Sequence, residues 1–104
     1  MIQNGVVSGG GDINVEYGSF FVAPGGNSVA FDTACKKVCA QYLDGRHIST
    51  VILSPGGSDN FSDAAESNYL PASLSSDGKT LTVSDPNHVG SGTVYYFAIS
   101  LGEL

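Results

Sequence analysis

Two cysteines four residues apart, Cys35 and Cys39, offer the most chemistry in this chain. Residues at this spacing lie about 6 Å apart in a helix, within disulfide reach, but about 13 Å apart along one strand. The spacing leaves three alternatives open: two buried or half-buried free thiols, a disulfide within the chain or between subunits, and a metal site. Zinc would need His47 and His88 as further ligands, and their distance in sequence makes metal the weakest alternative. No activating base stands beside either thiol, so we expect no thiol nucleophile.

A long polar segment, residues 55–68, is the second place where a ligand or partner could bind. We expect it to be a loop with a short helical turn over 63–67, and loops of this length in compact domains are often functional. Its carboxylates and amides suit calcium, but they lack the order of an EF-hand, so a solvated loop is the expectation. The candidate partner-binding residues in and beside this loop are Asp59, Asn60, Phe61, Asp63 and Tyr69.

Other candidate sites are weaker. His47 and His88 both fall in predicted turns, where surface histidines are expected and a shared ligand-binding rim is the alternative. No Gly-x-Ser-x-Gly element is present. The glycines at 9–11 are not followed by the Lys-Ser/Thr of a phosphate loop. We therefore expect no enzyme activity, no cofactor and no bound metal.

Composition predicts a single domain, residues 1–104, with a neutral polar surface. Only 13% of the residues are charged and 14 are glycine, as is typical of a turn-rich β domain. The net charge is −6 with four basic residues, too few to neutralise several phosphates, so we expect neither nucleic acid nor an anionic membrane as partner. Residues 1–5 lack a basic n-region, so we expect synthesis in the cytosol, where thiols stay reduced.

Alternating apolar and polar residues predict seven or eight short strands and no helix of ordinary length. A mixed run over 2–7 leads into a loop at 9–11, and Gly18 interrupts the next strand. Residues 34–43 fit either a helical turn or a strand after a turn at 36–37, and we favour the strand. The remaining strands are expected at 13–17, 19–23, 28–35, 38–43, 48–54, 70–76, 79–84 and 93–101. The expected fold is all-β, a single antiparallel, jelly-roll-like β-sandwich.

The stretch from residue 70 to 101 makes the sharpest structural predictions. Asp77-Gly78 predicts a two-residue type I′ turn, which pairs residue 74 with 81 and residue 72 with 83 and gathers the apolar side chains on one face. The closing strand, 93–101, is apolar on both faces and is expected to be central. Such a strand needs cover on both sides, and in a chain this short we expect one cover from a neighbouring subunit.

Three runs resemble a known family: Val29-x-Phe31, the apolar strand 49–54, and Tyr-Tyr-Phe-Ala-Ile-Ser-Leu-Gly at 95–102. They are similar to the small β-sandwich modules at the ends of tailed-bacteriophage fibres, which are related to H-type lectins. The resemblance implies a virion structural protein made in the host cytoplasm, a capsid or tail decoration protein or a fibre subunit.

The same resemblance implies other virion proteins as partners and a symmetric homo-oligomer, with a trimer as the first expectation. Cys35 or Cys39 could then cross-link neighbouring subunits. The alternative is a lectin-like, receptor-binding module in which the 55–68 loop and Tyr69 hold a glycan.

Overall fold

The computed structural model describes residues 3–9, 13–23, 26–62, 69–86 and 91–101. It confirms the all-β prediction, since the described residues contain strands and no helix. The described residues form nine strands, against seven or eight expected. Residues 3–9 and 58–62 also form strands, while the two strands expected at 13–17 and 19–23 are a single strand. Their bounds are β1 Gln3–Gly9, β2 Ile13–Phe21, β3 Asn27–Ala30, β4 Lys37–Asp44, β5 His47–Leu53, β6 Ser58–Ser62, β7 Tyr69–Leu74, β8 Thr80–Val83 and β9 Thr93–Leu101.

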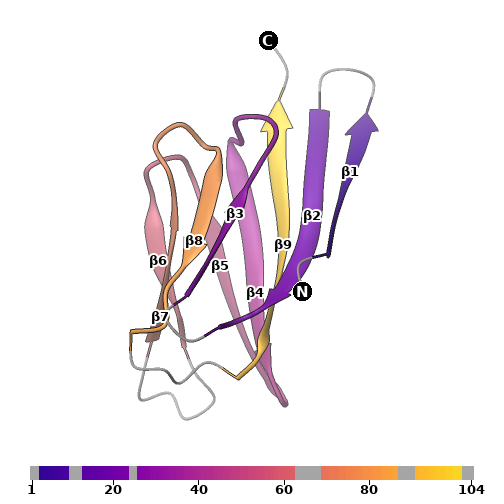
Figure 1. Cartoon of the computed structure of the whole chain (residues 1–104). Helices are drawn as coiled ribbons and strands as arrows, with labels where there is room; N and C mark the ends of the chain where they lie inside the picture. The colour runs from indigo at the N-terminus through magenta and orange to yellow at the C-terminus, as the bar shows by residue number, and fades with distance from the viewer. Residues whose placement is uncertain (1–2, 10–12, 24–25, 63–68, 87–90, 102–104) are drawn as a thin grey trace.

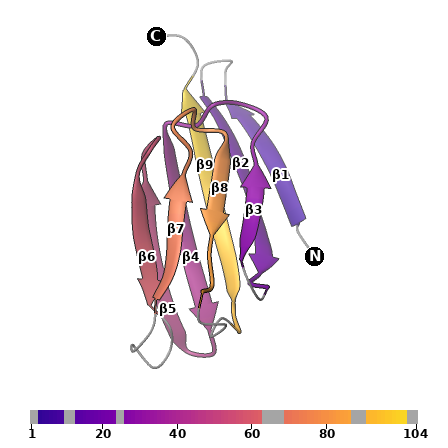
Figure 2. The ribbon, with the colours of Figure 1, turned by 60° about the vertical axis from the view of Figure 1, so that its left-hand side comes forward.

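The strands form two antiparallel sheets that pack face to face as a β-sandwich (Figures 1 and 2). The five-stranded sheet has the order β1-β2-β9-β4-β5, and the four-stranded sheet has the order β3-β8-β7-β6. As predicted, the strand at 93–101 is central: β9 lies between β2 and β4 and pairs with both along most of its length.

The core lies between the sheets and is built from alternate residues of each strand. In β9 the residues at 94, 96 and 98 are buried, and in β4 those at 38, 40 and 42. The Tyr96 ring lies against two phenylalanine rings, with its centroid 6.3 Å from that of Phe20 and 5.7 Å from that of Phe31. Such tilted aromatic pairs add to the stabilisation from buried area. The period of two that predicted the strands is therefore the same period that fills the core.

The β7–β8 hairpin has the predicted register but a different turn. Ala72 pairs with Val83 and Leu74 with Leu81, as expected. The turn is closed by the Gly78 N–H donating to the Ser75 carbonyl at 2.9 Å, which places residues 76 and 77, not 77 and 78, at its centre. The Ser75 hydroxyl also accepts the Thr80 N–H at 2.9 Å, so a side chain replaces a ladder bond. The loop between the paired strands is four residues long, 76–79, and the predicted loop was two residues long, 77–78. Both loops are symmetric about the bond between residues 77 and 78, so the strand pairing is unchanged.

Two strand predictions needed correction. Gly18 does not interrupt a strand: β2 runs through it, with Asn4 on one side and Tyr96 on the other. The strand predicted at 28–35 ends at Ala30. Beyond it, the buried Glu16 carboxylate accepts the backbone N–H groups of Asp32, at 2.9 Å, and Thr33, at 3.3 Å. That side chain takes the hydrogen bonds a strand would need and turns the chain towards the other sheet. The strand favoured after residues 36–37 is confirmed as β4.

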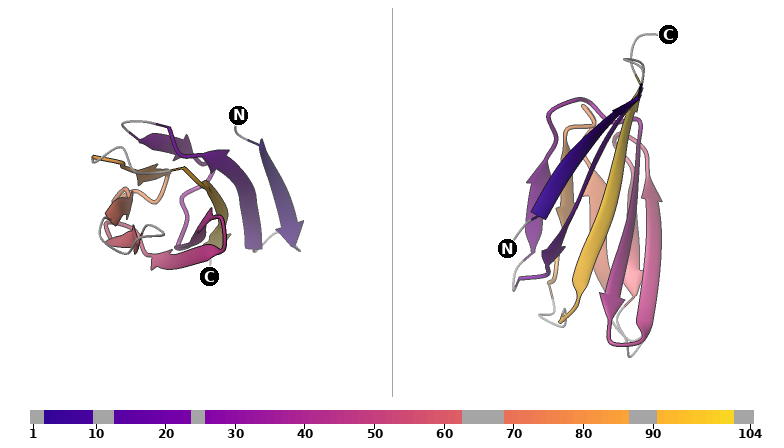
Figure 3. Two further views of the ribbon diagram at one scale, coloured as in Figure 1. Left: turned by 90° about the horizontal axis from the view of Figure 1, so that it is seen from below. Right: turned by 90° about the vertical axis from the view of Figure 1, so that its right-hand side faces the viewer.

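The predicted 55–68 loop contains a strand. Residues 58–62 form β6, which pairs with β7 along its whole length. This corrects the loop prediction over those five residues, while the helical turn expected at 63–67 lies outside the described residues. β6 also closes one side of the sandwich against β5, because the Ser62 N–H donates to the Ser49 hydroxyl at 3.0 Å. On the opposite side β1 extends the larger sheet away from β5 and β6 (Figure 3).

Candidate functional site

The most unusual surface of the molecule is the side of the five-stranded sheet that points away from the four-stranded sheet, which we call the outer face. On β2, β9, β4 and β5 it consists of the residues that alternate with the buried ones. Seven large hydrophobic side chains are exposed among the described residues, and six of them lie on it, including Phe97 at 56% and Ile52 at 64% exposure. Its described members are Val15, Tyr17, Ser19, Phe21, Lys37, Cys39, Gln41, Leu43, Ile48, Thr50, Ile52, Thr93, Tyr95, Phe97 and Ile99.

Strand register aligns these side chains in rows across the sheet. Tyr17 lies opposite Phe97, Phe97 opposite Cys39, and Cys39 opposite Ile52. Neighbouring strands are about 4.8 Å apart, so these four side chains form one continuous band. Single, scattered hydrophobic residues are common on the surface of any protein. A continuous band of them is not.

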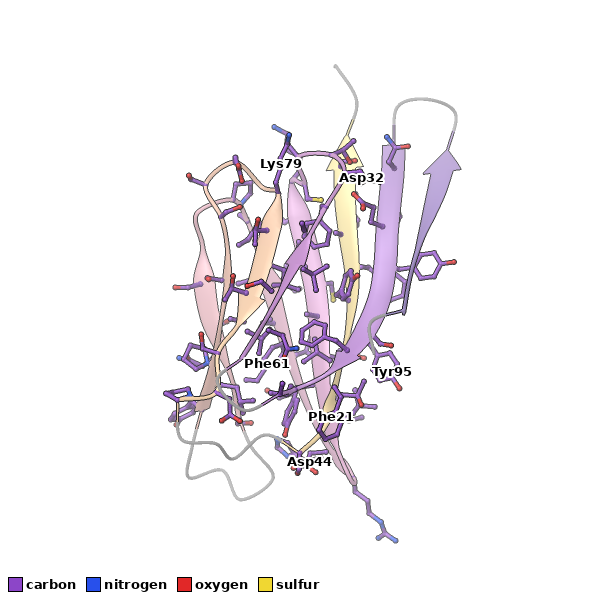
Figure 4. The ribbon with its side chains drawn as sticks, in the orientation of Figure 1. Phe21, Asp32, Asp44, Phe61, Lys79 and Tyr95 are labelled. Atoms are coloured by element: carbon purple, nitrogen blue, oxygen red, sulfur yellow. The ribbon has the colours of Figure 1, made fainter. Side chains whose placement is uncertain are left out.

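The next row is mostly polar and the one beyond it is again apolar. Tyr95 pairs with Ser19 and Gln41, and the Gln41 side-chain amide donates to the Thr50 hydroxyl at 3.3 Å. The following row runs from Phe21 across β9 and β4 to Ile48. Figure 4 shows Tyr95 projecting away from the four-stranded sheet, whereas Phe61 lies between the two layers.

Charge is almost excluded from the outer face. Among its described residues only Lys37 is charged, and its ammonium donates to the Ser54 hydroxyl at 2.7 Å at one end of the sheet. The chain carries ten acidic residues, yet no carboxylate of the described part projects from this face. Glu16, the one acid within the described stretch of β2, points inwards and is buried.

The outer side of the four-stranded sheet has a different character. Its described residues are mainly hydroxyl-bearing or small, and Ser28 and Thr82 are hydrogen-bonded across β3 and β8 at 3.3 Å. Tyr69, 56% exposed, is the one exposed large hydrophobic side chain among its described residues. An antiparallel sheet with one solvated side needs polar residues there, and only the smaller sheet meets that expectation.

The two cysteines occupy different environments and both are free thiols. Cys35 is buried, and its Sγ donates to the Thr33 carbonyl at 3.4 Å. Burial, and secondarily the nearby Glu16 carboxylate, raise the pKa of the Cys35 thiol to about 11. Cys39 is half-buried on the outer face, between Phe97 and Ile52. No cluster of three metal-ligating side chains occurs in the described part of the chain.

The structure scatters the residues predicted around the 55–68 loop. Phe61 is wholly buried and packs on Tyr42, with ring centroids 6.0 Å apart, so it is a core residue and cannot contact a partner. Asp59 and Asn60 are exposed on β6, and Tyr69 is exposed at the start of β7. Asp63 lies outside the described residues. Partner binding by Asp59, Asn60 and Tyr69 stays a prediction.

Of the two histidines in the predicted ligand-binding rim, His47 lies within the described residues. His47 begins β5, after a turn in which Gly45 adopts a positive φ of 62°. Its Nε2 lies 3.1 Å from both the carbonyl and the hydroxyl oxygen of Ser62, which ties β5 to β6. This is a structural role for His47. His88 lies outside the described residues.

Sequence reasoning identified one strand of the outer face and missed its neighbours. Tyr95 and Phe97 were expected to need cover, but Tyr17, Phe21 and Ile52 were not connected with them. The signal was present in the apolar alternation at 13–21 and 48–54. What the sequence lacked was strand order, because only the placement of β9 between β2 and β4 joins these residues into one surface.

The fold and the outer face define an antiparallel β-sandwich with one polar and one apolar side. Comparison with protein-family models, with curated protein sequences and with solved structures finds no match. A search of the described residues for a helix able to cross a membrane finds none.

Proposed function

We propose that this protein is a structural subunit that acts by assembly, and that its outer face is buried against another protein subunit. The proposal is supported above all by one observation: six large hydrophobic side chains are exposed together on one side of the five-stranded sheet. Contiguous apolar patches on soluble proteins commonly mark interaction sites. The binding energy of such a subunit would come from burying this face.

The size of the outer face suits this role. Aromatic side chains carry roughly 150–250 Å² each, so four half-exposed rings leave about 400 Å² of apolar surface in water. Ile48 and Ile52 raise the total to roughly 600 Å². The largest patch on a typical monomer is about 300–600 Å², so the outer face lies at the upper end of that range.

We further propose that the assembly is a virion, with the protein as a capsid or tail decoration protein or a fibre subunit. This step rests on the resemblance of the strands around Val29, Val51 and Phe97 to phage fibre modules. It also agrees with a sandwich that presents flat surfaces to neighbours. Within a virion, the outer face would be covered by other virion proteins or by copies of the same chain.

Oxidative footprinting tests the proposal directly. Particles from the source are isolated by sedimentation, the chain is detected in them with an antibody, and the oxidation rates of Tyr17, Tyr95 and Phe97 are compared with those in the dilute, purified chain. We expect strong protection of these rings in the particle. Tyr69, on the opposite sheet, reports general accessibility. Equal oxidation of the outer face in both states, or absence of the chain from particles, would refute the proposal.

The second candidate function is glycan binding, and one observation favours it. Tyr17, Tyr95 and Phe97 present rings on a sheet that also carries the hydrogen-bonding side chains of Ser19 and Gln41. Aromatic faces with polar groups between them can stack on sugars. A glycan array with the wild-type chain and a Tyr95→Ala variant separates the two functions. Specific binding that the variant loses would favour recognition over assembly.

A further inference from the structure

We propose that the partner covering the outer face is a second copy of this chain, packed face to face about a twofold axis. This inference rests on the proposed function, because it names the occupant of the same surface. It goes further in committing to self-association of the purified chain, with no other component present.

Charge favours a second copy as the occupant. The chain has a net charge of −6, so most approaches of two copies bring acidic residues together. The outer face is the exception, since its only charged side chain in the described strands is Lys37, at the end of β4 and hydrogen-bonded to Ser54. Two outer faces can therefore meet without opposing carboxylates. A basic partner, by contrast, would find no acidic group there to pair with.

Shape and area favour the same occupant. Two sheets stack at about 10 Å, the arrangement already present inside each molecule. Strands of nine residues, as in β2 and β9, span about 30 Å, and five strands about 20 Å. A partner sheet of the same dimensions would cover roughly 600 Å² on each copy. With the half-buried side chains at the rim, this approaches the roughly 800 Å² per partner of a stable interface.

An isologous contact has a specific consequence for Cys39. In such an interface the same patch is used by both copies, and residues near the axis meet their own counterparts. Cys39 lies in the apolar row between Phe97 and Ile52, opposite the middle residue of the central strand β9. The two Cys39 thiols are then brought close across the interface. A twofold contact also predicts dimers, whereas sequence reasoning alone expects a trimer first.

The first test is the mass of the purified chain in solution, measured by sedimentation equilibrium over a range of concentrations. We expect a monomer–dimer equilibrium. Phe97→Lys and Ile52→Lys each place a charge in the interface and should weaken dimerisation by at least about 30-fold, as loss of a hot-spot residue does. Tyr69→Lys is the matched control, because Tyr69 has the same 56% exposure as Phe97 but lies on the other sheet. Circular dichroism verifies that each variant is folded.

The second test is cross-linking with a short bismaleimide at neutral pH. Cys39 is the accessible thiol, and Cys35 is buried, so we expect a covalent dimer in wild type and in Cys35→Ser, but none in Cys39→Ser or Phe97→Lys.

A wild-type chain that stays monomeric at high concentration, that forms trimers, or whose Tyr69→Lys variant dissociates as readily as Phe97→Lys, would overturn the inference. If the chain is monomeric alone but its outer face is protected in particles, the second-copy inference fails while the assembly proposal stands. If the outer face is unprotected in particles as well, both fail.

Discussion

Raising the pH above 9 should destabilise this protein through one buried thiol. Cys35 is 1% exposed, and its pKa rises from 9.0 to about 11, first because burial disfavours the thiolate and second because the Glu16 carboxylate repels it. In the unfolded chain the thiol ionises near its ordinary value. Between these two pKa values the unfolded state releases a proton that the folded state keeps.

The sign and size of the effect follow from this difference. Since the folded pKa is the higher one, the contribution of Cys35 is fully present below pH 9 and is lost as the pH rises towards 11. A difference of about two pKa units corresponds to about 2.7 kcal/mol. Typical domains have a free energy of unfolding of about 5–15 kcal/mol, so this contribution is a large fraction of it.

Urea unfolding at a series of pH values between 7 and 11, on wild type and Cys35→Ala, measures the effect. The variant should show a constant loss below pH 9, and between pH 9 and 11 it should gain about 2 kcal/mol of stability relative to the wild type. Burial also raises the pKa values of Tyr42 and Tyr96, which weakens both proteins at high pH and cancels in the comparison. Parallel curves for the two proteins would refute the reasoning about Cys35.

Three further changes test the fold. Glu16→Ala removes the acceptor of the Asp32 and Thr33 N–H groups and should cost about 2–4 kcal/mol in urea unfolding, with Glu16→Gln intermediate; an unchanged midpoint would contradict this role. Gly92→Ala places a Cβ against the Leu43 carbonyl oxygen, closer than any real contact, and should cost about 3 kcal/mol by calorimetry. Gly45→Ala, whose Cβ would have nothing within 4 Å, should cost only about 1 kcal/mol. Phe61→Ala empties a buried site and should cost about 3–5 kcal/mol, whereas Asn60→Ala, at an exposed position, should cost less than about 0.5 kcal/mol. Comparable losses for the two variants would contradict the placement of Phe61 in the core.

The local pattern of the sequence was enough to predict the β7–β8 register. Ala72, Leu74, Leu81 and Val83 match only when the strands pair symmetrically about residues 77 and 78, and a slip of one residue would turn the two residues of one strand away from the core. The turn type was not predictable in the same way. It depends on the Ser75 hydroxyl accepting hydrogen bonds that a backbone carbonyl would otherwise accept, and residue type alone does not select that alternative.

Long-range contacts explain the remaining errors. β3 stops at Ala30 because of the Glu16 side chain, which is close in space but far from it in sequence. β6 has only one apolar residue, Phe61, so its strand character comes from pairing with β7 and not from its own pattern. The outer face depends in the same way on strand order. Sequence alone indicated that Phe97 needed cover, and strand order added Tyr17 and Ile52 to the same surface.

The position of β9 has a consequence for biosynthesis. This strand joins β2 to β4, so without residues 93–101 the larger sheet is only two separate hairpins, β1–β2 and β4–β5. Pairing β2 with β9 closes a loop of more than 70 residues, from Phe21 to Thr93, and such contacts form late in folding. On the ribosome, the rows of the outer face are therefore incomplete until β9 has emerged. In the proposed assembly, neighbouring nascent chains would therefore not join through a finished apolar face, and association would wait for the completed domain.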